Sequence, residues 1–232
     1  MAVILNIETS TRVCSVGLAV DGIITSIKET HAANSHAELV TLYSEFVIKE
    51  SGYTLADLDA VAVSKGPGSY TGLRIGVSTA KGFCYALDKP LIAIDTLKAM
   101  ADGMINQVEG DNFLVCPMID ARRMEVYAAV YSHQLQCIQK TEALIIDSGS
   151  FHSILNDHPI YFGGDGAAKC KEVLGHQKNA VFLESFHPSA KFMASLSEKK
   201  YQQDQFEDVA YFEPYYLKDF VARIPKVKGL KD

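Results

Sequence analysis

A carboxylate and two hydroxyl groups, from Glu8, Thr9 and Ser10, follow directly after a short apolar run near the start of the chain. A carboxylate in such a place can hold magnesium through water, and the hydroxyl groups can approach a phosphate. The same residue types are also common in turns, where they bond to the nearby backbone. Alone, the triplet does not decide between these two interpretations.

A glycine-rich run from Ser64 to Gly82, SKGPGSYTGLRIGVSTAKG, raises the same question. A Walker A loop needs a lysine and a hydroxyl residue after its last glycine, but Leu73 follows Gly72. The dinucleotide pattern G-x-G-x-x-G fails as well, because Thr71 holds its third glycine position. What remains is a strand, a Gly-Pro-Gly turn and a helix N-terminus.

The N–H groups of that helix N-terminus can face an anion, whereas the turn itself needs glycine for steric reasons alone. Both interpretations stay open. The candidate anion or nucleotide contacts are Glu8, Thr9, Ser10, Gly66, Gly68, Ser69 and Thr71.

The helix expected from Tyr70 to Leu87 carries two neighbouring stripes of low polarity. One stripe consists of Leu73, Val77, Ala80, Cys84 and Leu87, and the other of Gly72, Gly76, Thr79 and Phe83. Glycine inside a helix costs about 1 kcal/mol relative to alanine, so its presence indicates close approach of another backbone. The helix is therefore either buried on two sides within its own domain or in contact with a partner.

A first helix is expected from Ser35 to Glu50, with Ser35 and Glu38 as a capping box and Gly52 just past its end. Its apolar arc is also wide. The arc contains Leu39, Val40, Tyr43, Phe46, Val47 and Ile48. Two such helices can form half of a four-helix bundle with a partner.

Charged residues concentrate in one further turn, IDARRMEVY, which contains Asp120, Arg122, Arg123 and Glu125. Such a cluster is either a set of surface ion pairs or a docking surface. The run YFGGDGAAKCKEVL reads as strand, glycine loop and helix, with Asp165 either as a helix cap or near a nucleotide. The seven histidines are scattered, and we predict no metal site.

Bulk composition limits the class of protein. The 232 residues include 22 basic and 28 acidic side chains, a net charge of −6 that excludes a general nucleic-acid-binding field. The five cysteines form no C-x-x-C pair, which argues against a zinc site or a disulfide framework. Neither a signal peptide nor a membrane span is recognisable, so we expect a cytoplasmic protein with no membrane partner.

The order of predicted elements is β-β-β-α-β-α-β-α, followed by an abbreviated repetition after residue 112. Two such halves suggest the duplicated architecture of actin, sugar kinases and Hsp70 ATPase domains, a two-lobe α/β fold with mixed sheets. We predict an N-terminal lobe over 1–103, a smaller C-terminal lobe over 104–207, and a C-terminal segment over 208–232, for which the sequence leaves open whether it packs back on the first lobe.

Four stretches together, IETS, SHAE, KGPGSYTGLRIG and IDARRMEVY, resemble the bacterial TsaB (YeaZ) family over nearly the whole chain. The resemblance implies a small actin-like protein that is the non-catalytic partner of TsaD. TsaD transfers a threonylcarbamoyl group to adenosine beside the tRNA anticodon, and TsaE is an ATPase that joins the pair. Contact with tRNA would come only through the complex.

The same resemblance implies that the two helices above pack against counterparts on TsaD, and that the surface also supports a homodimer. The implied partner-binding residues are Leu39, Tyr43, Phe46, Val47, Gly72, Leu73, Gly76, Val77, Ala80, Phe83 and Cys84. We expect no cofactor bound tightly by the chain alone, and ATP or ADP with magnesium only in the complex.

One departure from TsaD bears on activity. TsaD carries a histidine-rich metal site after the strand that corresponds to PLIAI, whereas this chain continues with Asp95, Thr96 and Leu97. We therefore expect no transferase activity from the isolated chain. The alternative is an actin-like ATPase or small-molecule kinase that acts alone. A peptidase does not fit the sequence, because neither G-x-S-x-G nor H-E-x-x-H occurs.

Overall fold

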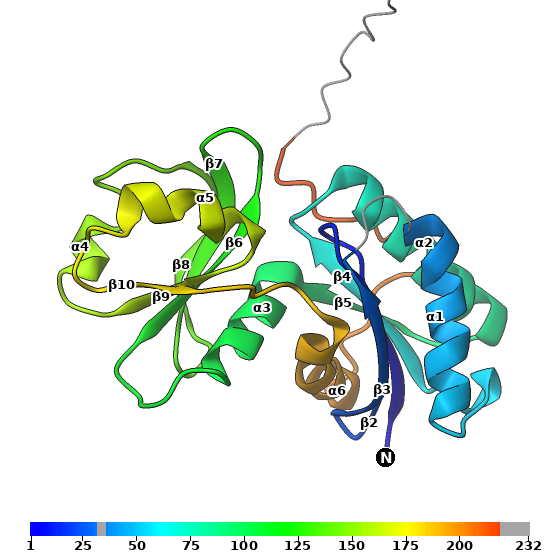
Figure 1. Ribbon diagram of the computed structural model, residues 1–232. Coiled ribbons are helices and arrows are strands. Elements are labelled where there is room, and N and C mark those ends of the chain that lie inside the picture. Colours follow the sequence, from blue (N-terminus) through cyan, green and yellow to red (C-terminus); the bar gives the residue numbers. More distant parts are fainter. Residues whose placement is uncertain (32–35, 219–232) are drawn as a thin grey trace, which may run out of the picture.

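The computed structural model describes residues 1–31 and 36–218, which form two lobes side by side (Figure 1). The N-terminal lobe contains β1 (Val3–Glu8), β2 (Cys14–Val20), β3 (Ile23–Thr30), α1 (His36–Glu50), a 3₁₀ turn (Leu55–Asp57), β4 (Ala60–Gly66), α2 (Tyr70–Leu87), β5 (Leu91–Asp95) and α3 (Thr96–Ile105). After it come β6 (Leu114–Asp120), β7 (Glu125–Ser132), β8 (Cys137–Ile145), α4 (His152–Leu155), β9 (Ile160–Gly163), α5 (Asp165–Leu174), β10 (Ala180–Leu183), a 3₁₀ turn (Ala190–Met193) and α6 (Ala194–Gln202).

Each lobe is built on a five-stranded sheet of the same topology. The strand orders are β3-β2-β1-β4-β5 and β10-β9-β6-β7-β8. In both sheets the first strand is central, with an antiparallel meander on one side and parallel strands on the other. This repetition confirms the duplicated, actin-like α/β fold that the element order predicts.

Local turn signals hold where the structure describes them. Asp21 and Gly22 have φ of 50° and 74°, the left-handed pair that a two-residue hairpin needs, and they join β2 to β3. Gly52 ends α1 with φ of 77°. The predicted cap Ser35 lies outside the described residues.

Both faces of the N-terminal sheet are buried, because other elements pack on each of them. Successive side chains of β1 point to opposite faces and so enter different layers. Leu5 and Ile7 face α1 and α2, whereas Ile4 faces the layer that contains Met193. Helix α3 lies between the two lobes, where Met100 and Met104 pack against the C-terminal sheet (Figure 1). The lobes therefore share one central helix.

Two features at the C-terminal end are not anticipated by the sequence patterns. Strand β10 has only four residues, and α6 buries only Ala194 and Ser197, so it has no apolar stripe to recognise. Beyond α6, Phe212 packs on the N-terminal core, and the Tyr215 N–H donates to the Lys65 carbonyl at 2.7 Å.

Among the described residues, no helix is long and apolar enough to cross a membrane.

The two glycines in the first half of α2 lie on the inner side of the helix. A Cβ at Gly72 would lie 2.1 Å from the Thr9 carbonyl oxygen, and one at Gly76 would lie 2.2 Å from Thr9 Oγ1. We expected both glycines at a partner, and the structure corrects this: both approach Thr9, directly after β1, Gly72 at its backbone and Gly76 at its side chain. The neighbouring stripe of α2 is also buried within the chain, at Leu73, Val77, Ala80 and Cys84, and so is Val47 of α1.

This packing predicts opposite effects for alanine at different glycines of α2. Gly72→Ala should lower the free energy of unfolding by about 1–3 kcal/mol or more, because the new methyl group overlaps backbone that cannot rotate away. Gly82 has no neighbour within 4 Å. Gly82→Ala should therefore raise stability by up to about 1 kcal/mol. Urea unfolding measures both, and equal stability of the two variants would contradict the packing.

Candidate functional site

A cavity of about 920 Å³ lies between the lobes. Its N-terminal wall consists of the turn after β1, residues 10–12, and the start of α2, residues 68–72. Its C-terminal wall consists of residues 119–122, Tyr127 and Asp165, and residues 216–218 close one side. Four of the predicted anion contacts line this cavity, namely Ser10, Gly68, Ser69 and Thr71. The other three, Glu8, Thr9 and Gly66, do not.

Glu8 is a structural residue. Its side chain is 1% exposed, and its Oε1 accepts hydrogen bonds from the Ser10 N–H at 2.6 Å and from Ser64 Oγ at 3.0 Å. Burial raises the pKa of Glu8, against the opposing effect of these bonds. The expectation that Glu8 faces magnesium through water is therefore corrected: the carboxylate holds the turn after β1 instead.

Thr9 and Gly66 also contribute to the packing of neighbouring segments. Thr9 Oγ1 donates to the Gly72 carbonyl at 2.8 Å, which ties the end of β1 to the first turn of α2. Gly66 has a φ of 117°, and a Cβ there would lie 2.6 Å from the Tyr215 carbonyl oxygen. The glycine is required by the left-handed backbone and by the C-terminal segment that crosses it.

The start of α2 joins the same turn from the other side. Ser69 caps the helix, because its side chain accepts from the Gly72 N–H at 3.3 Å, and the Ser69 N–H donates to the Ser10 carbonyl at 2.6 Å. A Cβ at Gly68 would lie 2.3 Å from that carbonyl oxygen. The steric interpretation of the Gly-Pro-Gly turn is thus confirmed, whereas anion binding at the helix N-terminus stays a prediction.

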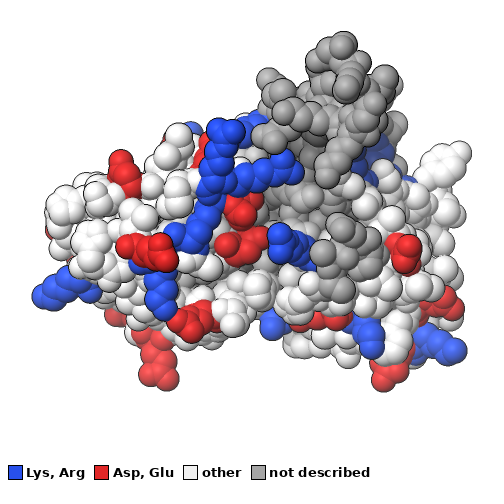
Figure 2. All heavy atoms as spheres, turned by 45° about the horizontal axis from the view of Figure 1, so that its top comes forward, with Lys and Arg blue, Asp and Glu red and all other residues white. Residues whose placement is uncertain are grey.

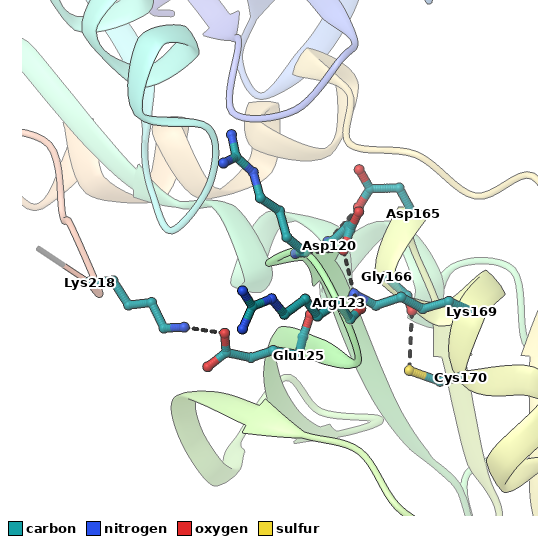
Figure 3. Close-up of polar contacts among 9 residues, drawn as sticks. Asp120, Arg123, Glu125, Asp165, Gly166, Lys169, Cys170 and Lys218 are labelled. Atoms are coloured by element: carbon teal, nitrogen blue, oxygen red, sulfur yellow. Dashed lines mark hydrogen bonds and ion pairs between the residues drawn. The ribbon is translucent and has the colours of Figure 1, made fainter. Parts of the chain in front are cut away.

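The charged turn between β6 and β7 is fixed by a lysine from α5 (Figure 3). Lys169 Nζ donates to the carbonyls of Arg123 at 2.6 Å and Glu125 at 2.7 Å, and forms an ion pair with Asp120. Burial alone would raise the pKa of Asp120, but the bonds from Lys169 and from the Arg122 N–H outweigh it and lower the pKa. Sequence reasoning missed Lys169, which lies 44 residues beyond the turn.

Asp165 lines the C-terminal wall, and Glu125 lies at the end of the charged turn beside it. The Asp120 N–H donates to Asp165 Oδ1 at 2.9 Å, and burial raises the pKa of Asp165. Glu125 forms an ion pair with Lys218 of the C-terminal segment (Figure 3). The turn is therefore a set of ion pairs, one of the two interpretations of its sequence.

A second candidate surface is the outer side of α1 and α2. Of the predicted partner-binding residues, Phe46 is 41% exposed, whereas Leu39, Tyr43 and Phe83 are half-buried. Leu42, 57% exposed, belongs to the same side of α1 but was not predicted. Its position three residues after Leu39 and four before Phe46 is the signal that could have identified it.

On α2 the exposed side differs from the predicted one. Ser78 and Gly82 face solvent, and Ile75 and Thr79 are half-buried beside them. The small residues available to a partner are thus Ser78 and Gly82 rather than Gly72 and Gly76. The two helices remain neighbours, with Leu39, Tyr43 and Ile75 packed on one core.

Comparison with known proteins gives consistent matches. Residues 23–226 match the family model "TsaD: tRNA N6-adenosine threonylcarbamoyltransferase". The chain is 30% identical over 229 residues to the tRNA threonylcarbamoyladenosine biosynthesis protein TsaB of Haemophilus influenzae, covering 94% of both chains. It is 29% identical over 229 residues to the Escherichia coli protein of the same name, covering 94% of this chain and 96% of the other.

Solved structures support the fold. YeaZ from Pseudomonas aeruginosa superimposes with a TM-score of 0.76 at 24% identity, covering 94% of this chain and all of the other. A second Pseudomonas aeruginosa structure, described as similar to peptidase YEAZ, gives a TM-score of 0.79 at the same identity. At this identity the likeness concerns the fold alone.

The lysine that fixes the charged turn can be tested against its neighbour on α5. Lys169→Met removes a charged donor from three acceptors, so it should lower the free energy of unfolding by about 2 kcal/mol. Lys171 forms only an exposed ion pair with Glu184. Lys171→Met should therefore cost about 0.5 kcal/mol or less. Denaturant unfolding measures both, and equal losses would show that Lys169 has no special role.

Proposed function

The chain belongs to the TsaB family of tRNA threonylcarbamoyladenosine biosynthesis proteins, and on that premise we propose that it acts in forming threonylcarbamoyladenosine on tRNA. Its role is that of a non-catalytic subunit. It binds a TsaD-type transferase through the outer side of α1 and α2, and supports the activity of that protein. A TsaE-type ATPase joins the pair in the cytoplasm, and ATP or ADP with magnesium binds in the complex.

The observation that carries this proposal is the apolar outer side of α1. Leu42 and Phe46 are exposed one turn apart, with the half-buried Leu39 and Tyr43 between and beside them. Apolar side chains grouped in this way on a helix are typical of a surface that another helix covers. Lys28 of β3 lies over one part of Phe46, with its Nζ 4.7 Å from the ring centroid, and the Phe46 side chain is still 41% exposed.

The exposed side of α2 suits a helix–helix contact. Gly82 and Ser78 leave little side-chain bulk, so a partner helix can approach the α2 backbone closely there. The inner side of α2 is already occupied by Thr9, as described above. The same outer surface is self-complementary in principle, and we infer that a homodimer uses it when the partner is absent.

The placement of two acidic residues supports a non-catalytic role. Glu8 is buried, and Asp95, which stands where TsaD has its metal histidines, pairs with Lys65 at 3.2 Å. Within residues 1–31 and 36–218, no three His, Cys, Asp or Glu side chains are grouped so that they could hold a metal ion. These arrangements also disfavour the alternative, an actin-like ATPase or kinase that acts alone.

Two substitutions on the outer surface test the proposal. Phe46→Glu and Gly82→Arg place a charge where the helices meet, and each should weaken binding to the TsaD protein of the same organism at least about 30-fold, close to 2 kcal/mol. Ile138→Glu is the matched control, since Ile138 is 53% exposed on β8 of the other lobe. Its complex should form normally.

Gel filtration of the mixed proteins and calorimetric titration measure the loss. Circular dichroism should be unchanged for all three variants, because the altered side chains face solvent or open space. If Phe46→Glu binds as well as Ile138→Glu, the outer side of α1 is not the binding surface. If the wild-type chain fails to bind while both proteins are folded, the partner role itself is wrong.

A further inference from the structure

Three of the four arginines in the described residues lie in the two turns that form opposite walls of the cavity, and two of them line it. Arg12 lies in the turn after β1, Arg122 lines the opposite wall, and Arg123 follows it. All three side chains are exposed, and within the described part of the chain none forms an ion pair. Unpaired guanidinium groups gathered in a protein of net charge −6 indicate a site for an anion that the chain itself does not supply.

The local charge is opposite to that of the whole chain. Two cations, Lys169 and Lys218, add to the three arginines, and three carboxylates lie among them, those of Asp120, Glu125 and Asp165. Figure 2 shows basic side chains gathered on the face where the lobes meet, with a few acidic ones among them. The cavity therefore has a positive excess within an acidic protein.

The turn that carries Arg122 and Arg123 has an unusual backbone conformation that the rest of the lobe holds in place. Arg122 and Arg123 have φ of 71° and 52°, left-handed values for which glycine or asparagine is preferred in a two-residue turn. Lys169 holds this backbone through the carbonyls of Arg123 and Glu125. Because the local backbone would favour other residues, the arginines are explained by their guanidinium groups, whose planar fork suits phosphate.

Two tyrosine rings line the same cavity as Arg12 and Arg122. The rings of Tyr70 and Tyr216 are 5.0 Å apart and both line the cavity, and the Arg74 guanidinium lies 4.2 Å from the centroid of Tyr70. Arg74 Nε also donates to the Tyr216 hydroxyl at 3.2 Å. Tyrosines next to a phosphate-binding groove are the arrangement on which unpaired bases stack.

The carboxylates of the cavity are unsuited to a magnesium-bound mononucleotide. Asp120 is engaged by Lys169, Asp165 by the Asp120 N–H, and Glu8 is buried away from the cavity. A nucleoside triphosphate brings a magnesium ion that prefers one or two available carboxylates. RNA phosphates need only the cations.

We propose that the arginine cleft, defined as Arg12, Arg122, Arg123, Lys218, Tyr70 and Tyr216, binds the backbone and an unpaired base of single-stranded RNA. This inference rests on the proposed function, which identifies the RNA as the tRNA substrate; the family resemblance implies that the modified adenosine lies beside the anticodon. It replaces the expectation that tRNA is contacted only through the partner. His36 and Thr71, at the N-terminal ends of α1 and α2, also line the cavity, so RNA in the cleft would lie next to a partner bound on those helices.

Direct binding is measured by fluorescence anisotropy of the full chain with a labelled anticodon stem–loop RNA. The double variant R122A/R123A should bind at least about 10-fold more weakly, and its slope of log K against log salt should fall by about 1.4 to 1.8. The matched control, K140A/K178A, removes the same charge from exposed residues at the two opposite edges of the C-terminal sheet. Its slope should stay at the wild-type value.

Two further results decide between this inference and the others. Tyr216→Ala should weaken binding several-fold with an unchanged salt slope, because it removes stacking and no charge. In the reconstituted reaction with TsaD, R122A/R123A should raise the KM for tRNA at unchanged kcat and unchanged co-elution with the partner.

The inference is overturned if the wild-type chain does not bind the stem–loop, if the two double variants bind alike, or if magnesium–ATP displaces the RNA stoichiometrically. A wild-type chain that fails to support modification of tRNA would instead overturn the proposed function. The two failures are thus distinguishable.

Discussion

The close packing of α2 on the end of β1 determines how the rest of the N-terminal lobe is used. Thr9 meets Gly72 and Gly76 with no room for a side chain, and its Oγ1 bonds to the Gly72 carbonyl. One whole side of α2 is therefore committed to the chain's own core. Only the opposite side, with Ser78 and Gly82, is left for another protein, and the first turn of α2 is brought to the cavity between the lobes.

The same contact explains why the Glu8 carboxylate does not reach the cavity. Glu8 is used to hold Ser10 and Ser64, so it supports the turn on which Ser69 rests. On the other lobe, Lys169 performs the corresponding task for the arginine turn. Each wall of the cavity is thus built on a buried or half-buried charge that stabilises backbone, and the exposed groups that remain are mainly hydroxyls, tyrosines and arginines.

Much of the fold follows from local patterns. The Asp21-Gly22 hairpin, the strand–helix alternation and the repetition of both lobes can all be predicted from the sequence, because period-2 and period-3.6 patterns report local structure directly. The side of α2 on which Gly72 and Gly76 lie cannot be predicted in this way. Both stripes of that helix have low polarity, and periodicity does not say which stripe meets the sheet. The role of Lys169 cannot be predicted from the sequence either, because it depends on a contact with a turn that is distant along the chain. Helix α6 is not predicted, because it is polar and buries few side chains.

The central claim is that the outer side of α1 is covered by a TsaD-type partner, and site-specific photo-cross-linking tests it most directly. A benzophenone amino acid replaces either Leu42 or Ile138, which are 57% and 53% exposed on different lobes. The account predicts a covalent product with TsaD from position 42 and none from position 138. A product from position 138 alone would contradict it.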